Sequence, residues 1–410
     1  MKRKNDTFFK KLSFCAIAFF LSVCYNVAND QRASPFIKEI IMKITTQKFK
    51  FREFDFKECY VLARAGALNE NDLVMTMQNL NIAGCDDFSP LLVLTSNDGG
   101  KSWTAPAADP AFVTDVDADG LRRVGCDATL LFHKKTGVLI VAGHTACYEA
   151  GSNVPAKSYK RQTYYSTYEP KTGKFAPIGW IDIPESITPY DCANGCSQYI
   201  EEEDGDILMP MCVYHGGAPT GSAVFRLGFD GKHLTVKDMG NELSYPTARG
   251  IGEVSITRYK GKYYQTIRHD DCALWSVSED GLHFSEPEKW TWDSGCELPS
   301  YNTQAHWLQC GGKLYLVYTR RAGNNDHVFR HRAPLFMAEV DVESMAILRH
   351  TEKIVVPERG ARLGNFGVTQ INDDKALVTV TEWMQFYTGD AKHCAKFGSD
   401  NSLFVTTVEA

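Results

Sequence analysis

The chain has 410 residues, of which 44% are hydrophobic, and a formal net charge of −6 at pH 7. This size and composition allow a large buried core, either in two or three ordinary domains or in one long β-rich domain. A nucleic-acid-binding protein usually presents a basic face, and this mildly acidic chain gives no sign of one, so we expect no nucleic-acid partner.

The first residues have the composition of an export signal. The basic segment MKRKNDTFFKK is followed by an uncharged, apolar run over residues 12–24. This order is typical of a secretory signal peptide, and the run is short for a transmembrane helix. We expect a signal peptide over residues 1–28 and a mature single domain over residues 29–410. The protein is then secreted or periplasmic, with no stable insertion in the membrane.

The cysteines leave their pairing open. Of the 13 cysteines, Cys15 and Cys24 lie in the expected signal peptide, and the remaining odd number leaves at least one free thiol in a monomer. Cys192 and Cys196 are near enough in sequence to form a disulfide. Most of the cysteines are equally compatible with small buried residues.

After about residue 45 the chain alternates short strands with turns. The candidate strands are rich in β-branched and aromatic residues and are bounded by turn formers; they cover residues 137–143, 206–214, 222–229, 313–319 and 375–383. Glycine-containing turns, such as those at Gly205 and Gly261, separate neighbouring strand candidates and predict hairpins. No long stretch has helical periodicity. Many short hairpins favour a closed, repeating β architecture, because radial repetition protects the strand edges.

Two turn segments share a pattern of Ser, Asp, Gly and an aromatic residue. They are SNDGGKSW at residues 96–103 and the shorter SEDGLHF at residues 278–284. The Asp carboxylate can accept backbone N–H groups in the turn, Gly supplies a positive φ, and the aromatic ring packs between sheets. These segments resemble the Asp-box, or BNR, repeats of the sialidase (neuraminidase) superfamily. The resemblance implies an all-β fold, a six-bladed β-propeller of the sialidase type with roughly 60 residues in each blade.

A second resemblance covers residues 252–281. In sialidase-like enzymes a glutamate opens one strand, an arginine closes the partner strand, and an Asp box follows; Glu253, Arg268 and the Ser278 box stand in this order. The hairpin turn at Gly261 brings the two strands together, so both side chains can face a central funnel. Arginine can grip a carboxylate through two parallel hydrogen bonds, and glutamate can act as a base. A structural ion pair between the strands is the alternative.

Three loop segments concentrate arginine, histidine and amide side chains. We expect them to share one rim of the fold and to bind the hydroxyl and anionic groups of a substrate. The candidate substrate-binding residues in these loops are Gln304, His306, Arg321, Asn325, His327, Arg332 and Arg362. Each of them can instead satisfy backbone groups in a long loop.

Two further candidates come from an earlier hairpin. Asp127 is predicted at the start of one strand and His144 at the end of its partner strand. Asp127 is a candidate general acid, and His144 is a candidate acid, base or sugar ligand. HTAC, residues 144–147, could be half of a metal site, but no partner spacing marks a zinc motif, so we expect no metal and no other cofactor.

The sialidase resemblance implies a set of catalytic parts. These are three arginines for the substrate carboxylate, a tyrosine nucleophile paired with glutamate, and an aspartic acid. Glu253 and Arg268 match two of the positions. No motif selects the other arginines, and an early arginine, Arg64, stands in ARAG rather than in the usual Arg-Ile-Pro. The tyrosines considered as nucleophiles are Tyr148, Tyr318 and Tyr387.

The leading hypothesis is an exported, exo-acting glycoside hydrolase, similar to sialidases, that removes a terminal sugar, expected to be acidic, from glycans. Glu253, Asp127 and His144 are its candidate catalytic residues, and a monomer is sufficient. One alternative is a polysaccharide lyase on a related propeller, with Arg268 against the uronate carboxylate and His144 as the base. The other is a glycan-binding propeller without catalysis.

Overall fold

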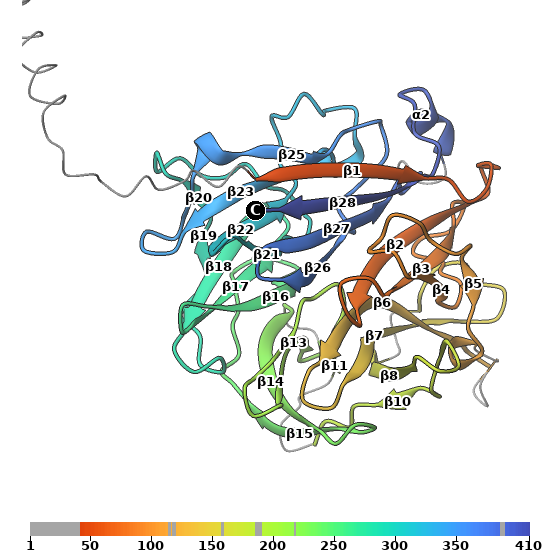
Figure 1. Ribbon diagram of the computed structural model, residues 1–410, viewed down its shortest axis with the longest axis horizontal. Helices are drawn as coiled ribbons and strands as arrows, with labels where there is room; N and C mark the ends of the chain where they lie inside the picture. Colours follow the sequence, from red (N-terminus) through yellow and green to blue (C-terminus); the bar gives the residue numbers. More distant parts are fainter. Residues whose placement is uncertain are drawn as a thin grey trace, which may run out of the picture. The chain divides into compact units, whose positions relative to one another are not determined.

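A computed structural model describes residues 42–113, 116, 120–156, 160–184, 191–216, 219–385 and 390–410. The expected signal peptide and the candidate nucleophile Tyr387 lie outside the described residues. Residues Met42–Ala410 form one unit, nearly all of it β-structure, in six sheets arranged as the blades of a propeller (Figure 1). In the part of the chain that is described, no helix is long and apolar enough to cross a membrane.

The first three blades follow one another along the chain. Blade one contains β2 (Glu58–Ala67), β3 (Leu73–Asn81), β4 (Leu92–Ser96) and β5 (Ala107–Ala108). Blade two contains β6 (Arg122–His133), β7 (Val138–Tyr148), β8 (Thr163–Glu169) and β10 (Gly179–Trp180), with β9 (Lys174–Phe175) beside β8. Blade three contains β11 (Asp191–Ala193), β12 (Ile200–Glu201), β13 (Ile207–Tyr214), β14 (Gly221–Phe229) and β15 (Leu234–Met239). The 3-10 helix η1 (Pro110–Phe112) links blades one and two.

The last three blades repeat the arrangement. Blade four contains β16 (Gly252–Tyr259), β17 (Lys262–Arg268), β18 (Ala273–Ser278) and β19 (Glu288–Lys289). Blade five contains β21 (His306–Cys310), β22 (Lys313–Tyr318), β23 (Leu335–Asp341) and β25 (Lys353–Val356), with β24 (Ala346–Ile347) and β20 (Thr291–Trp292) at its edge. Blade six contains β26 (Gly367–Asn372), β27 (Lys375–Thr381), β28 (Leu403–Glu409) and β1 (Lys43–Phe49). The helical segments here are η2 (Phe329–His331), η3 (Arg349–Thr351) and α2 (Ala391–Ala395).

Blade six is built from both ends of the described chain. Its outer strand β1 pairs antiparallel with the last strand β28, in a register that sets Lys43 opposite Glu409. The innermost strands of blades six and one, β26 and β2, lie in contact. The pairing of the first strand with the last strand therefore completes blade six, which closes the ring of sheets.

The two Ser-Asp-Gly segments form turns with the local hydrogen bonds that the sequence predicts. Asp98 Oδ1 accepts the Ser102 amide at 2.9 Å, and Gly100 has a φ of 86°. Asp280 Oδ1 accepts the amides of Leu282 and His283 at 2.9 and 2.8 Å. Each turn joins the third strand of a blade to its short outer strand, away from the innermost strands.

A different backbone feature recurs at the innermost strands. Five blades place one non-glycine residue in the left-handed region there: Leu62 (φ 60°), Asp127 (55°), Cys196 (54°), Glu253 (45°) and Asn302 (44°). In blades one, two and four this residue coincides with a shift in strand register, which is a β-bulge. A bulge redirects one side chain out of the regular alternation. These bulges position the polar groups of the candidate site.

Candidate functional site

A pocket opens beside the bulges of blades two and four and is also lined by blade three. It has a cavity volume of about 130 Å³, and its lining includes Asp127, His144, Glu253 and Arg268. The lining also includes Arg161 and Arg249, which the sequence analysis did not select. Strands of blades two and four and the segments before β8 and β16 supply these residues, so charged groups far apart in sequence meet around one cavity.

Glu253 and Arg268 form the ion pair that the hairpin predicts. The register of β16 and β17 sets Gly252 opposite Arg268, and Arg268 Nη1 donates to Glu253 Oε1. Arg268 Nη2 also donates to Asn302 Oδ1, at 2.7 Å. The arginine therefore connects the left-handed residues Glu253 of blade four and Asn302 of blade five, and it lines the pocket with its glutamate partner.

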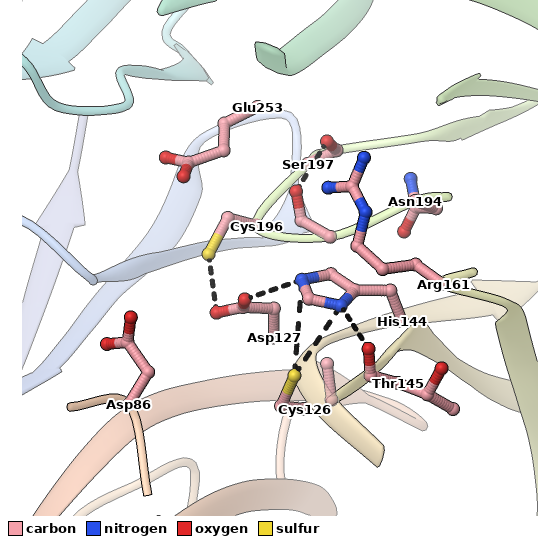
Figure 2. A network of polar contacts seen from close by, with 12 residues as sticks. Asp86, Cys126, Asp127, His144, Thr145, Arg161, Asn194, Cys196, Ser197 and Glu253 are labelled. Carbon is pink, nitrogen blue, oxygen red and sulfur yellow. Dashed lines mark hydrogen bonds and ion pairs between the residues drawn. The ribbon is translucent and has the colours of Figure 1, made fainter. Parts of the chain in front are cut away.

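Asp127 lies at the centre of a second network, which Figure 2 shows. Its Oδ2 is 2.9 Å from His144 Nε2, and its Oδ1 accepts the Cys196 thiol at 2.8 Å. Burial alone would raise the pKa of the Asp127 carboxyl, but the hydrogen bond and charge of His144 and the charge of Arg64 lower it below its usual value. Asp127 is therefore held as an ionised carboxylate.

The strands around Asp127 are longer than the sequence predicts. Asp127 lies within β6 and His144 within β7, so neither residue stands at a strand end. Gly143 permits this continuation, because a Cβ at that position would lie 2.3 Å from the Cys126 carbonyl oxygen. The apolar pattern placed the end of the predicted strand at Gly143, and it does not show that the two backbones approach each other closely there.

Arg64 is buried among the innermost segments of the ring and links several of them. Its side chain is 2% exposed, and it donates to the carbonyls of Phe366 and Ala128, each at 3.1 Å. Its Nη2 donates to Cys196 Sγ at 3.0 Å. One guanidinium thus bridges segments of blades two, three and six, and this position favours a structural role over direct contact with a substrate.

Asp86 is a candidate that the sequence analysis missed. It follows β3 in an exposed turn with a φ of 49°. Loss of surrounding water, followed by the charge of Asp127, raises the pKa of the Asp86 carboxyl (Figure 2 shows both residues). An Asp-Asp pair after glycine resembles an ordinary turn, so only the charge interaction with Asp127 distinguishes Asp86.

Gln304 and His306 lie inside the ring, each with 1% exposure. Gln304 Nε2 donates to the Phe366 carbonyl at 3.3 Å, and His306 Nδ1 is 2.8 Å from Ser255 Oγ. Burial, together with the charge of Arg64, lowers the pKa of His306 to about 3, so its ring is neutral. The structure does not bring these two residues to the pocket lining.

Arg332 and Arg362 are buried arginines without a carboxylate partner among the described residues. Arg332 donates to the Asn302 carbonyl from Nε at 3.1 Å and from Nη2 at 2.6 Å. Arg362 Nη2 donates to Gln385 Oε1 at 2.9 Å. Burial and the charges of Arg268 and Arg362 lower the pKa of Arg332. A bound anion would relieve this repulsion.

The other three loop candidates are engaged in the structure of the loop. Arg321 lies 4.1 Å from the centre of the Tyr301 ring, and Asn325 Nδ2 donates to the Ala333 carbonyl at 2.6 Å. His327 Nε2 is 2.7 Å from Glu358 Oε1. None of the three belongs to the described pocket lining. Asn325 fits the backbone-satisfying alternative, whereas Arg321 and His327 contact the side chains of Tyr301 and Glu358.

The described candidate tyrosines do not face Glu253. The Tyr148 hydroxyl donates to the Asp86 carbonyl, and the Tyr318 hydroxyl donates to Glu352 Oε1 at 2.7 Å. Cys192 and Cys196 are both free thiols. A Cys192–Cys196 disulfide is therefore absent from the described structure, where Cys196 binds Asp127 instead.

Comparison with known proteins defines the fold. No protein-family model and no curated protein sequence matches the chain. A Dyadobacter fermentans protein of unknown function is similar in structure, with a TM-score of 0.62 and 15% identity over 89% of this chain and 99% of that chain. A Trypanosoma rangeli sialidase in complex with sialic acid has a TM-score of 0.57 and 12% identity, over 89% of this chain and 58% of that chain.

A leech intramolecular trans-sialidase is similar as well, with a TM-score of 0.58 and 12% identity over 88% of this chain and 70% of that chain. The chain matches little more than half the length of the trypanosomal enzyme. The protein is a six-bladed β-propeller of the sialidase type. At these identities the likeness defines the fold and leaves the chemistry to the site residues.

Proposed function

We propose that this chain is an exported, exo-acting glycoside hydrolase that removes a terminal acidic sugar from a glycan. The observation that carries the proposal is the pocket in which Asp127 and Glu253 stand beside Arg268. Most glycosidases use two carboxyl groups that flank the glycosidic bond. The sialidase-type propeller supports a glycan as the substrate.

Three arginines around the pocket favour an anionic sugar. Arg268 forms an ion pair with Glu253. Arg249 Nη1 lies 3.3 Å from Asp270 Oδ1. Arg161 Nε donates to Asp191 Oδ2 at 3.1 Å. Each of these ion pairs fixes a planar guanidinium at the cavity wall. A guanidinium fixed in this way can bind a carboxylate or a similar anion with defined geometry.

The carboxyl groups differ in protonation, and this difference supports separate roles. Asp86 has a raised pKa and suits a proton donor, while Asp127 has a lowered pKa and suits a base. In the proposed reaction Asp86, which is outside the described pocket lining but interacts electrostatically with Asp127, gives its proton to the leaving glycosidic oxygen. Asp127 takes a proton from the attacking water, and the hydroxyl group bonds to the anomeric carbon.

Glu253 then faces the positive charge that develops on the sugar ring and orients Arg268. This scheme replaces the tyrosine nucleophile of the sialidase resemblance with a pair of carboxylates, because Tyr148 and Tyr318 are bound elsewhere. The lyase alternative, in which His144 is the base, is distinguished from hydrolysis by its products.

The first test is digestion of sialylated, uronic-acid-containing and neutral glycans by the purified chain. A released sugar with the mass of added water supports the proposal. A product lighter by one water, with new ultraviolet absorbance, would overturn it in favour of a lyase. Binding without any product would overturn it in favour of a glycan-binding propeller.

A matched pair of variants then tests the site. Glu253→Gln removes the carboxylate charge and should abolish turnover without changing the fold. Glu279→Gln is the control, since Glu279 lies on the same blade in an exposed ion pair with Lys262. Near-normal turnover in Glu253→Gln would contradict the assignment.

A further inference from the structure

Three different ligand types meet beside the pocket. Cys126, Asp127 and His144 each offer one sulfur, oxygen or nitrogen atom, and these atoms lie within 4.8 Å of one another. We propose that the three side chains bind a thiophilic divalent cation, of which Zn²⁺ is the closest fit. This site goes beyond the proposed function, and its existence does not depend on that function.

The bulge in β6 assembles the three ligands. Cys126 lies directly opposite His144 in the pairing of β6 and β7, and the register shifts immediately after Cys126. In a regular strand, the side chains of Cys126 and Asp127 would point to opposite faces. Because Asp127 has a φ of 55°, the bulge turns both side chains toward His144 (Figure 2).

The hydrogen bonds of His144 leave one nitrogen for a ligand. Its Nδ1 is 3.1 Å from the Thr145 carbonyl oxygen, which can only accept, so Nδ1 carries a hydrogen. In the neutral ring, Nε2 then presents a lone pair to Asp127 Oδ2, 2.9 Å away. Two facing acceptors need a proton or a metal ion between them. A histidine whose other nitrogen donates to a carbonyl is a common arrangement in metal sites.

The spacing suits a tetrahedral ion after small movements. His144 Nε2 is 4.0 Å from Cys126 Sγ and 2.9 Å from Asp127 Oδ2. In tetrahedral zinc sites, bond lengths place neighbouring ligand atoms roughly 3.4–3.6 Å apart. Shifts of about half an ångström would bring His144 Nε2 to these distances from the other two ligand atoms, which lie within 4.8 Å of each other. A thiolate with an imidazole selects zinc-like ions over calcium and magnesium, which prefer oxygen ligands.

The fourth coordination position would face the pocket. Cys126 is 1% exposed and closes the inner side, whereas the Asp127 and His144 side chains are 18% and 19% exposed and line the cavity. Three protein ligands and one open position are typical of sites that bind water or a ligand on the metal.

Arg64 contacts Cys196, which donates to Asp127 Oδ1, and Arg161 lines the same pocket as Asp127 and His144. A cation on Asp127 Oδ2 would occupy the carboxylate that the proposed hydrolysis uses as its base. Zinc should therefore inhibit hydrolysis, and this consequence alone depends on the proposed function.

The test is a Co²⁺ titration of the untagged chain, followed by displacement with Zn²⁺. We expect one equivalent of Co²⁺ to produce sulfur-to-cobalt charge-transfer absorbance and tetrahedral visible bands. Cys126→Ser should abolish the charge-transfer band, and His144→Ala should weaken binding at least about tenfold. Cys310→Ser is the matched control, because that buried cysteine lies on β21 and contacts the Asp374 carbonyl.

Absence of the charge-transfer band in the folded wild type would overturn the proposal, as would its survival in Cys126→Ser or its equal loss in Cys310→Ser. Circular dichroism and thermal melting check that the variants fold. If Cys126→Ser fails to fold, His144→Ala and Asp127→Asn decide, and unchanged Zn²⁺ affinity in both would overturn the site. A chain that binds Co²⁺ as expected but digests no glycan contradicts only the proposed hydrolysis.

Discussion

The turn aspartates and the pocket aspartate are stabilised as carboxylates in different ways. In the turn, hydrogen bonds from the Ser102 side chain and amide lower the pKa of Asp98 to about 2, and Ser96 contributes as well. All these partners lie within four residues. In the pocket, Asp127 depends on His144 across a hairpin, on Cys196 in blade three and on Arg64 in blade one. A short motif can encode the first arrangement, whereas the second requires the whole ring.

The largest expected effect comes from removing the pocket charge. Asp127→Asn keeps the shape of the side chain but cannot accept a proton from water. We expect kcat/KM on the glycan that the chain cleaves to fall by about 10²–10⁴. Asp280→Asn in the turn should leave kcat/KM within about twofold of the wild type. Equal losses in the two variants would remove the distinction between the two kinds of aspartate.

Arg64→Met should give the largest loss of stability. The change leaves the carbonyls of Phe366 and Ala128 without their donor and removes a cation from beside Asp127. We expect the free energy of unfolding to fall by roughly 3 kcal/mol. Arg258→Ala, which removes a surface ion pair with Glu203, is the control and should cost less than about 1 kcal/mol. Chemical denaturation measures both, and similar losses would argue against the bridging role of Arg64.

The pH dependence of unfolding free energy should distinguish the carboxyl group of Glu382 from both kinds of aspartate. Burial raises the pKa of Glu382 to about 7, although the Asp400 amide and the charge of Arg359 oppose the shift. The folded state thus holds a proton that the unfolded state releases, so this contribution to stability is lost as pH rises from about 4.5 to 7. The change is on the order of 3 kcal/mol. Glu382→Gln should flatten the profile of unfolding free energy over this range, and an unchanged slope would contradict the assignment.

The smallest expected effect is on the turn. Asp280→Ala removes the acceptor for the Leu282 and His283 amides, so we expect a loss of roughly 1 kcal/mol in unfolding free energy. The melting temperature should fall by about 2 °C, with kcat unchanged. Differential scanning calorimetry measures the first effect and glycan digestion the second. A loss of activity in this variant would indicate that the turn reaches the pocket.

The sequence predicted the parts of the fold that local patterns determine. The strand expected over residues 206–214 is β13 (Ile207–Tyr214), and the strand expected over residues 222–229 is β14 (Gly221–Phe229). The turn at Gly261 also gave the neighbourhood of Glu253 and Arg268 correctly. Strand alternation and turn residues act over a few positions, so they predict local structure even when the assembly of the blades is unknown.

The site was less predictable because its contacts join different blades. Nothing near Asp127 in the sequence indicates Cys196 or Arg64, and the bulge that aims Asp127 has no marker residue. Arg161 and Arg249 reach the pocket from loops that looked unremarkable, whereas the arginine-rich loop was a stronger pattern. Within that loop, Asn325 serves the backbone. In this loop, a high density of polar residues therefore indicates side chains that stabilise the loop rather than a substrate-binding surface.

Strand β28 lies between β1 and β27, and these are the earliest and nearly the latest described strands of the chain. During synthesis, β1 is made before its partner exists and stays unpaired until residues Leu403–Glu409 have appeared. Loss of those residues would expose the edges of β1 and β27. Truncation before Leu403 should therefore leave blade six incomplete even though the rest of the ring has already been made.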